Sequence, residues 1–483
     1  MANLVYDVHE KPKFGQLLVY AFQQLLAIIA ATILVPVLIG IGDHMNAALL
    51  GAGIGTLLYI LITKKKSPVM LSSSFAYIGA LTLAYQGYGF LGILLGGFFS
   101  GLVYVVISII IKFVGTAWIE KLLPPIVIGP VVMLIGLSLS VSAVSNLLSA
   151  NGYFYIDGGS QVHPYNLIAL LCGLVAFFVV VFCTIQGRSD KMRATPFLLG
   201  ILAGYLLAGI FSAIGYAADA PYLKIIDFGP LVDNFKNLTV RSFIDYPKVI
   251  LYEGIKEIVD SNVKLTGIGV AEIALAFIPI SLVSFSEHVA DHKNLSSIIN
   301  KDLVNDEPGL SRTVMGDGVG NITGTFFGVC PNTTYGESIG CVAITKNASV
   351  VTTIATAIMC VVLAFITPVT AALRTIPTCV MGGICLALYG FIAASGLKML
   401  KGLEVAEGKN LFTLSVILVS GLGGLALQIP YKLGLIAPEL TGVVRFIEVG
   451  AIGFALILGI ITYKFASFVE RKTGVKEEPE NNQ

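Results

Sequence analysis

The stretch "CPNTTYGESIG", residues 330–340, places a carboxylate, Glu337, among glycines and hydroxyl side chains in a region whose flanks are almost wholly apolar. A second stretch, "PVMLSSSFAY", residues 68–77, repeats the arrangement of a proline, small polar residues and an aromatic residue. Short, interrupted hydrophobic segments at corresponding positions of two halves indicate an inverted repeat whose binding site lies at the membrane midplane. We therefore expect these two stretches to be broken membrane spans that meet at a site.

The composition is that of an integral membrane protein. The chain has 483 residues, of which 56% are hydrophobic and 12% are charged, and its mean hydropathy is +0.87. Soluble domains are much less apolar and about twice as charged. Repeated apolar runs near the roughly 20 residues of a transmembrane helix predict an all-α polytopic bundle rather than a barrel of short strands.

The apolar runs give the number of crossings. The uninterrupted runs are Leu17–Gly40, Ala47–Thr63, Phe90–Phe113, Pro124–Val144, Asn166–Phe182, Thr195–Tyr216, Thr266–Ser286, Ser349–Ile366, Pro377–Leu400, Asn410–Leu427 and Gly450–Phe468. Three more, Val69–Tyr85, Met315–Cys330 and Gly336–Thr345, are short or interrupted by small and polar residues. Together they predict about fourteen transmembrane segments arranged as a seven-plus-seven inverted repeat, with short extended strands in the two broken spans.

Positive charge predicts the orientation. Lys and Arg are enriched in short cytoplasmic loops. If the N-terminus is in the cytoplasm, the cytoplasmic loops contain Lys64–Lys66, Arg188, Lys191 and Arg193. The loop 145–165 carries neither Lys nor Arg. The long polar segment Ala217–Lys264 falls outside, and its basic residues are balanced by acids. We expect both termini in the cytoplasm and no cleaved signal peptide.

Carboxylates in the apolar spans indicate a site. Glu287 ends the run Thr266–Ser286, and on a continuing helix Asp291 lies on the same face one turn later, while His288 points about 100° away. A carboxylate at the bilayer centre costs about 3 kcal/mol even on lenient scales, so it faces a cavity or a partner. Carboxylates that share such a cavity hold a proton more readily than in water and can pass it across. The alternatives are a solvated helix end for Glu287 and hydroxyls that only pack between helices.

Other site chemistries find no support in the sequence. The seven cysteines lack ligand spacing and read as packing residues. His44, His163 and His292 read as loop or interface residues, and no metalloprotease, phosphate-loop or serine-hydrolase motif is present. With a net charge of +1 and no long basic run, the chain offers nothing for nucleic acid. We expect no metal, no cofactor and no enzymatic activity.

These motifs resemble those of the nucleobase/ascorbate transporter family, and in particular its bacterial uracil permeases. The resemblance runs nearly end to end. It rests on "ATILVPVL" (31–38), "SSFAY" (73–77), "SEHVADH" (286–292), "PNTTYGESIG" (331–340), "AITK" (343–346), "PTCVMGG" (377–383) and "LYGFIAASG" (388–396).

The resemblance implies a site and a fold. Glu287 and Glu337 match two acidic positions that hydrogen-bond a uracil ring. Phe75, Tyr335 and Gly336 match positions beside the ligand on the broken spans, and Tyr389 matches a nearby aromatic residue. The chain departs from the family pattern at Asp291, where relatives often carry His, at Ser338, where Asn is usual, and at Gln23 and Gln24, in place of Gln-His. A proton role thus falls on Glu287, Asp291 and Glu337, or passes to His288 or His292.

The family also implies a division of the chain and a homodimer. Residues 1–113 and 263–370 would form a core domain from the two repeats. Residues 114–262, with an extracellular loop, and 371–470 would form a gate domain, followed by a cytoplasmic tail, 471–483.

The leading hypothesis is a multi-pass importer of uracil in the cytoplasmic membrane, coupled to protons by the acidic cluster and working by alternating access. Purine-transporting relatives commonly carry Gln at the position of Glu337, so a symporter of xanthine or another purine is the alternative. An ion or solute channel, and then a membrane enzyme, are less favoured, since no nucleophile-base pair is visible.

Overall fold

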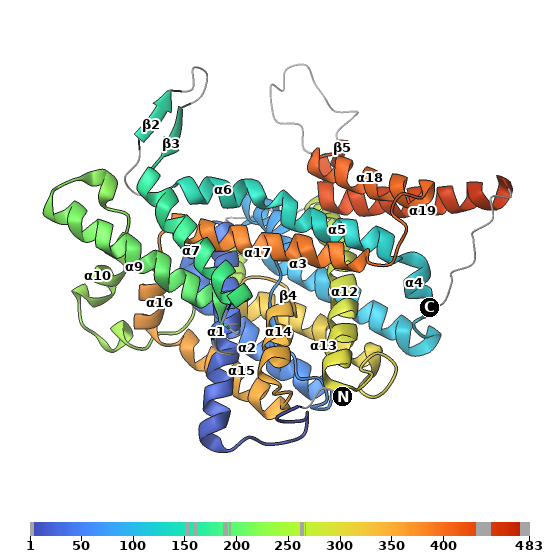
Figure 1. Cartoon of the computed structure of the whole chain (residues 1–483), viewed down its shortest axis with the longest axis horizontal. Helices are drawn as coiled ribbons and strands as arrows, with labels where there is room; N and C mark the ends of the chain where they lie inside the picture. Colours follow the sequence, from blue (N-terminus) through green and yellow to red (C-terminus); the bar gives the residue numbers. More distant parts are fainter. Residues whose placement is uncertain are drawn as a thin grey trace. The chain divides into compact units, whose positions relative to one another are not determined.

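The computed structural model is described here for residues 4–149, 154–157, 162–186, 192, 195–260, 265, 267–430 and 446–473. Within these ranges the chain is mostly helical (Figure 1). The predicted basic residues Arg188, Lys191 and Arg193, and residues 474–483 of the predicted tail, lie outside them.

Packing divides the chain into two compact units. The first comprises residues 1–114 and 139–389, and the second comprises 115–138 and 390–483. The predicted division into core and gate domains stays a prediction.

The first unit contains the broken spans and most of the helices. Up to residue 217 its elements are α1 (Phe14–Leu38), η1 (Gly42–His44), α2 (Met45–Ile62), β1 (Leu71–Ser73), η2 (Phe75–Tyr77), α3 (Ile78–Val114), α6 (Ser140–Leu148), β2 (Phe154–Asp157), β3 (Val162–Tyr165), α7 (Leu167–Gln186) and α9 (Pro196–Ala217). There follow η3 (Pro221–Leu223), α10 (Gly229–Lys236), η4 (Val240–Ser242), α11 (Ile250–Val259), α12 (Gly267–Ile299), α13 (Gly309–Thr323), η5 (Gly324–Gly328), β4 (Asn332–Thr334), α14 (Gly336–Thr345), α15 (Val350–Ala364) and α16 (Thr367–Arg374).

The second unit is a small helical cluster. It contains α4 (Ala117–Leu122), α5 (Pro125–Ser138), α18 (Gly408–Leu422), β5 (Leu427–Pro430), β6 (Phe446–Val449) and α19 (Ala451–Thr473). The helix α17 (Thr378–Met399) begins in the first unit and ends in the second. In this unit α5, α18 and α19 pack against one another.

The helices confirm a polytopic membrane protein. Among the described residues, nine helical stretches are long and apolar enough to cross a membrane, and α15 and α18 are shorter apolar helices. One of the nine, residues 75–114, joins two predicted runs across a kink, because Tyr88 and Gly89 leave the helical conformation and Gly89 has a φ of +58°. The predicted broken span Met315–Cys330 is the end of α13 followed by a π-helical turn, η5.

Helices of the first unit pack closely around the broken spans. α13 lies against both α2 and α3, α15 lies against α1 and α2, and α7 and α9 lie side by side (Figure 1). A Cβ atom on Gly51 of α2 would stand 2.6 Å from the carbonyl oxygen of Gly324 and 2.7 Å from Cα of Gly328. The absence of a side chain at residue 51 therefore lets α2 approach the backbone of η5.

This approach predicts that Gly51→Ala destabilises the protein, because the methyl group meets backbone atoms that cannot turn away. Overpacking of this kind costs about 1–3 kcal/mol, to be read as a lower midpoint of thermal unfolding in detergent. Gly15→Ala in α1 is the control, since nothing lies within 4 Å of a Cβ atom there. Equal midpoints for the two variants would show that the α2–η5 approach is not tight.

Candidate substrate site

The two broken spans meet as an antiparallel pair of strands. Leu71 of β1 pairs with Thr334 of β4, Ser72 with Thr333, and Ser73 with Asn332. The main-chain N–H of Ser74 donates to the carbonyl of Pro331 at 3.1 Å and extends the ladder. This antiparallel meeting of matching segments is the arrangement that an inverted repeat produces.

Side chains from neighbouring helices complete the hydrogen bonding of these strands. Thr56 Oγ1 of α2 accepts from the N–H of Leu71 at 3.0 Å and donates to its carbonyl at 3.3 Å. The hydroxyls of Thr32 in α1 and Ser72 are 2.6 Å apart. Asn332 Nδ2 donates to the carbonyl of Gly51 at 2.9 Å. Extended backbone at membrane depth is tolerated because protein groups satisfy it.

The helix α12 lies beside this crossing and contacts η2, β4 and α14. It continues through Glu287 to Ile299, so Glu287 is in the middle of a helix and not at its end. One turn later, Asp291 Oδ2 accepts a hydrogen bond from Thr334 Oγ1 of β4 at 2.8 Å. Glu287 and Asp291 are both half-buried. Glu287 and Asp291 thus lie one turn apart on a continuing helix, as the helical spacing predicted, and Asp291 contacts the broken span through β4.

Glu337 lies in the first turn of the half-helix α14, which follows β4 directly. Tyr335 is buried, whereas Gly336 is exposed and Glu337 is half-buried. A Cβ atom on Gly336 or Gly340 would meet nothing within 4 Å. Space is thus open beside the first turn, whose leading N–H groups have no partner within the helix. Glu287 lies close enough to Glu337 for their charges to interact.

Aromatic rings border the same elements. Phe75 of η2 meets Tyr389 of α17 edge to face, with ring centroids 6.1 Å apart and an interplanar angle of 76°. Both side chains are buried, at 7% and 3% exposure. The hydroxyl of Tyr335 and that of Ser73 are buried and make no hydrogen bond within the described part of the chain. The predicted residues thus come from four elements, and Tyr389 joins them through its contact with Phe75.

A fourth carboxylate, Asp317 of α13, was missed by the sequence reading. It is fully buried, and its Oδ2 lies 2.6 Å from His288 Nδ1 and 3.2 Å from the donor Thr333 Oγ1. His288 Nε2 lies 3.1 Å from Thr313 Oγ1. The available signal was an acid in the glycine-rich run "MGDGVGN", residues 315–321, because a charge there needs a partner.

The interpretation of His292 as a loop or interface residue was wrong. His292 lies inside α12 at 1% exposure, and its ring stacks on that of His288 with centroids 4.1 Å apart. Its Nδ1 donates to the carbonyl of His288 at 2.9 Å, and its Nε2 lies 2.8 Å from the hydroxyl of Tyr59. His292 lies one turn after His288, on the face of α12 beside the acidic one, and its burial is not revealed by residue type and spacing alone.

Two positions at which the chain departs from the family pattern contact each other. Gln24 Nε2 of α1 donates to Ser338 Oγ of α14 at 2.8 Å, and the N–H of Met70 donates to the same hydroxyl at 3.1 Å. Gln24 Oε1 accepts from Thr356 at 3.2 Å. The residue after Glu337 therefore fixes the half-helix to α1 and to the start of β1.

Comparison with known proteins decides the family. The model of the Permease family (Xan_ur_permease) matches residues 15–429. The chain belongs to this permease family. It is a membrane transporter and not an enzyme, as the sequence predicted.

The relatives that match are similar over most of their length. The uracil permease of Bacillus caldolyticus is 36% identical over 448 residues, which cover 92% of this chain and 94% of the relative. The uracil permease of Escherichia coli (strain K12) is 33% identical over 470 residues, 96% of each chain.

Solved structures confirm the fold class. The transmembrane domain of the cyanobacterial bicarbonate transporter BicA is similar with a TM-score of 0.55 at 14% identity, covering 95% of this permease and all of that chain. The structure of SLC26A9 is similar with a TM-score of 0.58 at 10% identity, covering 95% of this permease and 66% of that chain. This permease therefore shares its fold with these proteins. Because the sequence identities are low, the similarity shows the fold and nothing about the substrate.

The buried His288–Asp317 pair gives a prediction on stability. Removing either partner by His288→Ala or Asp317→Ala leaves the other buried group with only its threonine partner, Thr333 or Thr313, and costs about 3–5 kcal/mol. A double-mutant cycle by thermal unfolding is expected to show a coupling of about 1–3 kcal/mol. The same cycle on the exposed pair Lys224–Asp219 is the control, with no measurable coupling expected. Additive effects at His288 and Asp317 would contradict the pairing.

Proposed function

We propose that this permease imports uracil across the cytoplasmic membrane together with protons. The observation that carries the proposal is the pair Glu287 and Glu337, two carboxylates held beside the crossing of the broken spans in a chain 33–36% identical to uracil permeases. We further propose that both termini lie in the cytoplasm and that the permease forms a homodimer.

The chemistry of uracil fits these groups. The uracil ring carries two N–H donors and two carbonyl acceptors, and ionised carboxylates accept hydrogen bonds and donate none. Glu287 and Glu337 would bind the ring N–H groups, while the leading N–H groups of α14 would bind a carbonyl. The aromatic rings of Phe75, Tyr335 and Tyr389 would pack on the apolar faces of the ring.

Proton coupling follows from charge repulsion. Glu287 lies within electrostatic range of Glu337 and Asp317, and Asp291 follows one turn along α12. Like charges in a desolvated place repel one another, and a bound proton relieves this repulsion. Protonation of Glu287, Asp291 or Glu337 would therefore accompany binding of a neutral nucleobase. Movement of the predicted core, residues 1–113 and 263–370, against the predicted gate, 114–262 and 371–470, would then alternate access.

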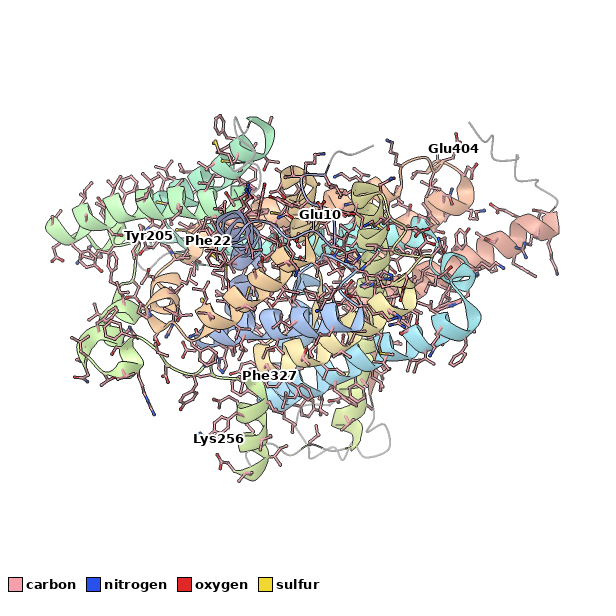
Figure 2. The ribbon with its side chains drawn as sticks, turned by 90° about the horizontal axis from the view of Figure 1, so that it is seen from below. Glu10, Phe22, Tyr205, Lys256, Phe327 and Glu404 are labelled. Atoms are coloured by element: carbon pink, nitrogen blue, oxygen red, sulfur yellow. The ribbon has the colours of Figure 1, made fainter. Side chains whose placement is uncertain are left out.

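Substitution of the carboxylates tests the site. Glu287→Gln and Glu337→Gln keep the size of the side chain but replace a charged acceptor, and each is expected to weaken uracil binding about 10- to 100-fold. Binding of labelled uracil to purified protein measures the loss. Glu404→Gln is the matched control, because Glu404 is exposed between α17 and α18 (Figure 2). Wild-type affinity in both site variants would refute the assignment.

Uptake into proteoliposomes tests the substrate and the coupling. An imposed pH gradient, acidic outside, is expected to raise the initial rate of labelled-uracil uptake severalfold, and a protonophore is expected to abolish the increase. Excess unlabelled uracil should compete for uptake, and excess xanthine should not. Uptake of labelled xanthine that excess uracil does not block would instead favour the purine symporter, and uracil uptake that neither saturates nor responds to the protonophore would favour a channel.

A further inference from the structure

The N-terminal residues 4–10, which we call the strap, form part of the folded first unit. Main-chain hydrogen bonds join the strap to the link between α14 and α15: Val5 N–H donates to Lys346 O at 2.8 Å, Ala348 N–H to Tyr6 O at 2.9 Å, and Val350 N–H to Val8 O at 3.0 Å. Tyr6 and Asn347 form a parallel β-bridge. The strap is thus paired with the residues that end the half-helix α14.

The far end of the strap is fixed at the same link. Ser349 Oγ donates to the main-chain oxygen of Glu10 at 2.6 Å, and Glu10 is labelled in Figure 2. The hydroxyl of Tyr6 donates to Gln16 Oε1 at 2.7 Å, and the ring of Tyr6 meets that of Tyr20 edge to face. The strap therefore joins the α14–α15 link to the start of α1.

A third contact joins the strap to α12. Lys301, two residues beyond the end of α12, donates to both carboxylate oxygens of Asp7 at 2.9 and 2.8 Å. Both side chains are more than two-fifths exposed. An exposed ion pair contributes little stability by itself, so this contact adds to the main-chain pairing of the strap and does not replace it.

The apolar side chain of Val8 anchors the strap in a hydrophobic cluster. Val8 is 1% exposed and belongs to a single hydrophobic cluster with residues of α12, α14 and β1. These residues are Leu295 and Ile299 of α12, Ile339 and Val342 of α14, and Leu71 of β1. Val8 therefore shares a hydrophobic cluster with α12, which carries Glu287 and Asp291, and with α14, which carries Glu337.

We propose that the strap is a positioning element of the substrate site, an inference that rests on the proposed uracil transport. α14 has ten residues, and helices shorter than about 12 residues have little stability of their own. Its direction is fixed by what holds its two ends. β4 holds the end at Glu337, and the strap holds the other. At 1.5 Å per residue, Glu337 lies about 12 Å from the last residue of α14, and Glu287 lies about 18 Å from the last residue of α12. Both of these helix ends contact the strap.

Val8→Thr tests this role. The substitution keeps the shape of Val8 but buries a hydroxyl among apolar side chains, which loosens the strap. We expect an affinity for labelled uracil about fivefold or more weaker than in the wild type, with amounts of monodisperse protein in the membrane unchanged. Val5→Thr is the matched control in the same strap, because the Val5 side chain is 55% exposed. It should bind uracil as the wild type does.

A readout without substrate separates this inference from the proposed function. Hydrogen exchange of residues 332–341 is expected to be faster in Val8→Thr than in Val5→Thr, because a loosened strap frees β4 and α14 to open locally. If exchange differs in this way but the wild-type protein binds no uracil, the positioning role of the strap is supported and uracil is refuted as the substrate. Equal exchange and equal uracil affinity in the two variants would overturn the proposed positioning role of the strap.

The exposed ion pair provides a second test should Val8→Thr fail to reach the membrane. Asp7→Lys places two cations together and is expected to weaken uracil binding and to speed exchange over residues 332–341. The charge-swapped protein, Asp7→Lys with Lys301→Asp, is expected to recover both properties. Wild-type binding and exchange in Asp7→Lys would overturn the inference without reference to Val8.

Discussion

Extended backbone at membrane depth needs hydrogen-bond partners, because lipid offers none. In this permease the two broken spans hydrogen-bond each other through the β1–β4 pair. Thr32 of α1 and Thr56 of α2 add hydrogen bonds to β1. The close approach at Gly51 brings η5 and Asn332 within reach of α2. The same pairing turns the first turn of α14, with Glu337, toward α12, so the solution for the backbone also builds the site.

Buried charge at this site is distributed over two networks. Asp317 is held by His288 and Thr333 in the interior, whereas Asp291 accepts from Thr334 on the side of Glu287. Neighbouring threonines of one strand point to opposite faces and so bind carboxylates on two different helices. The strand β4 therefore contacts both networks, one through each threonine.

The short half-helix depends on the elements around it. Ser338 attaches the first turn of α14 to Gln24 and to Met70, and the strap pairs with the link that follows its last turn. Val8 fills the apolar cluster between α12, α14 and β1. A ten-residue helix gains its stability from such packing rather than from its own propensity, which explains why contacts distant in sequence converge on this segment.

Hydrophobicity, proline and helical spacing act locally, and so the amino-acid sequence was enough to predict a helical membrane protein, broken spans at residues 68–77 and 330–340, and a helix face shared by Glu287 and Asp291. It did not reveal Asp317, the burial of His292 or the strap. Their roles depend on partners far away in the sequence: Asp317 on His288 and Thr333, His292 on Tyr59, and Val8 on α12 and α14. Only tertiary packing decides which polar groups meet, because an apolar run fixes that a helix crosses the membrane but not which neighbour its polar side chains will face.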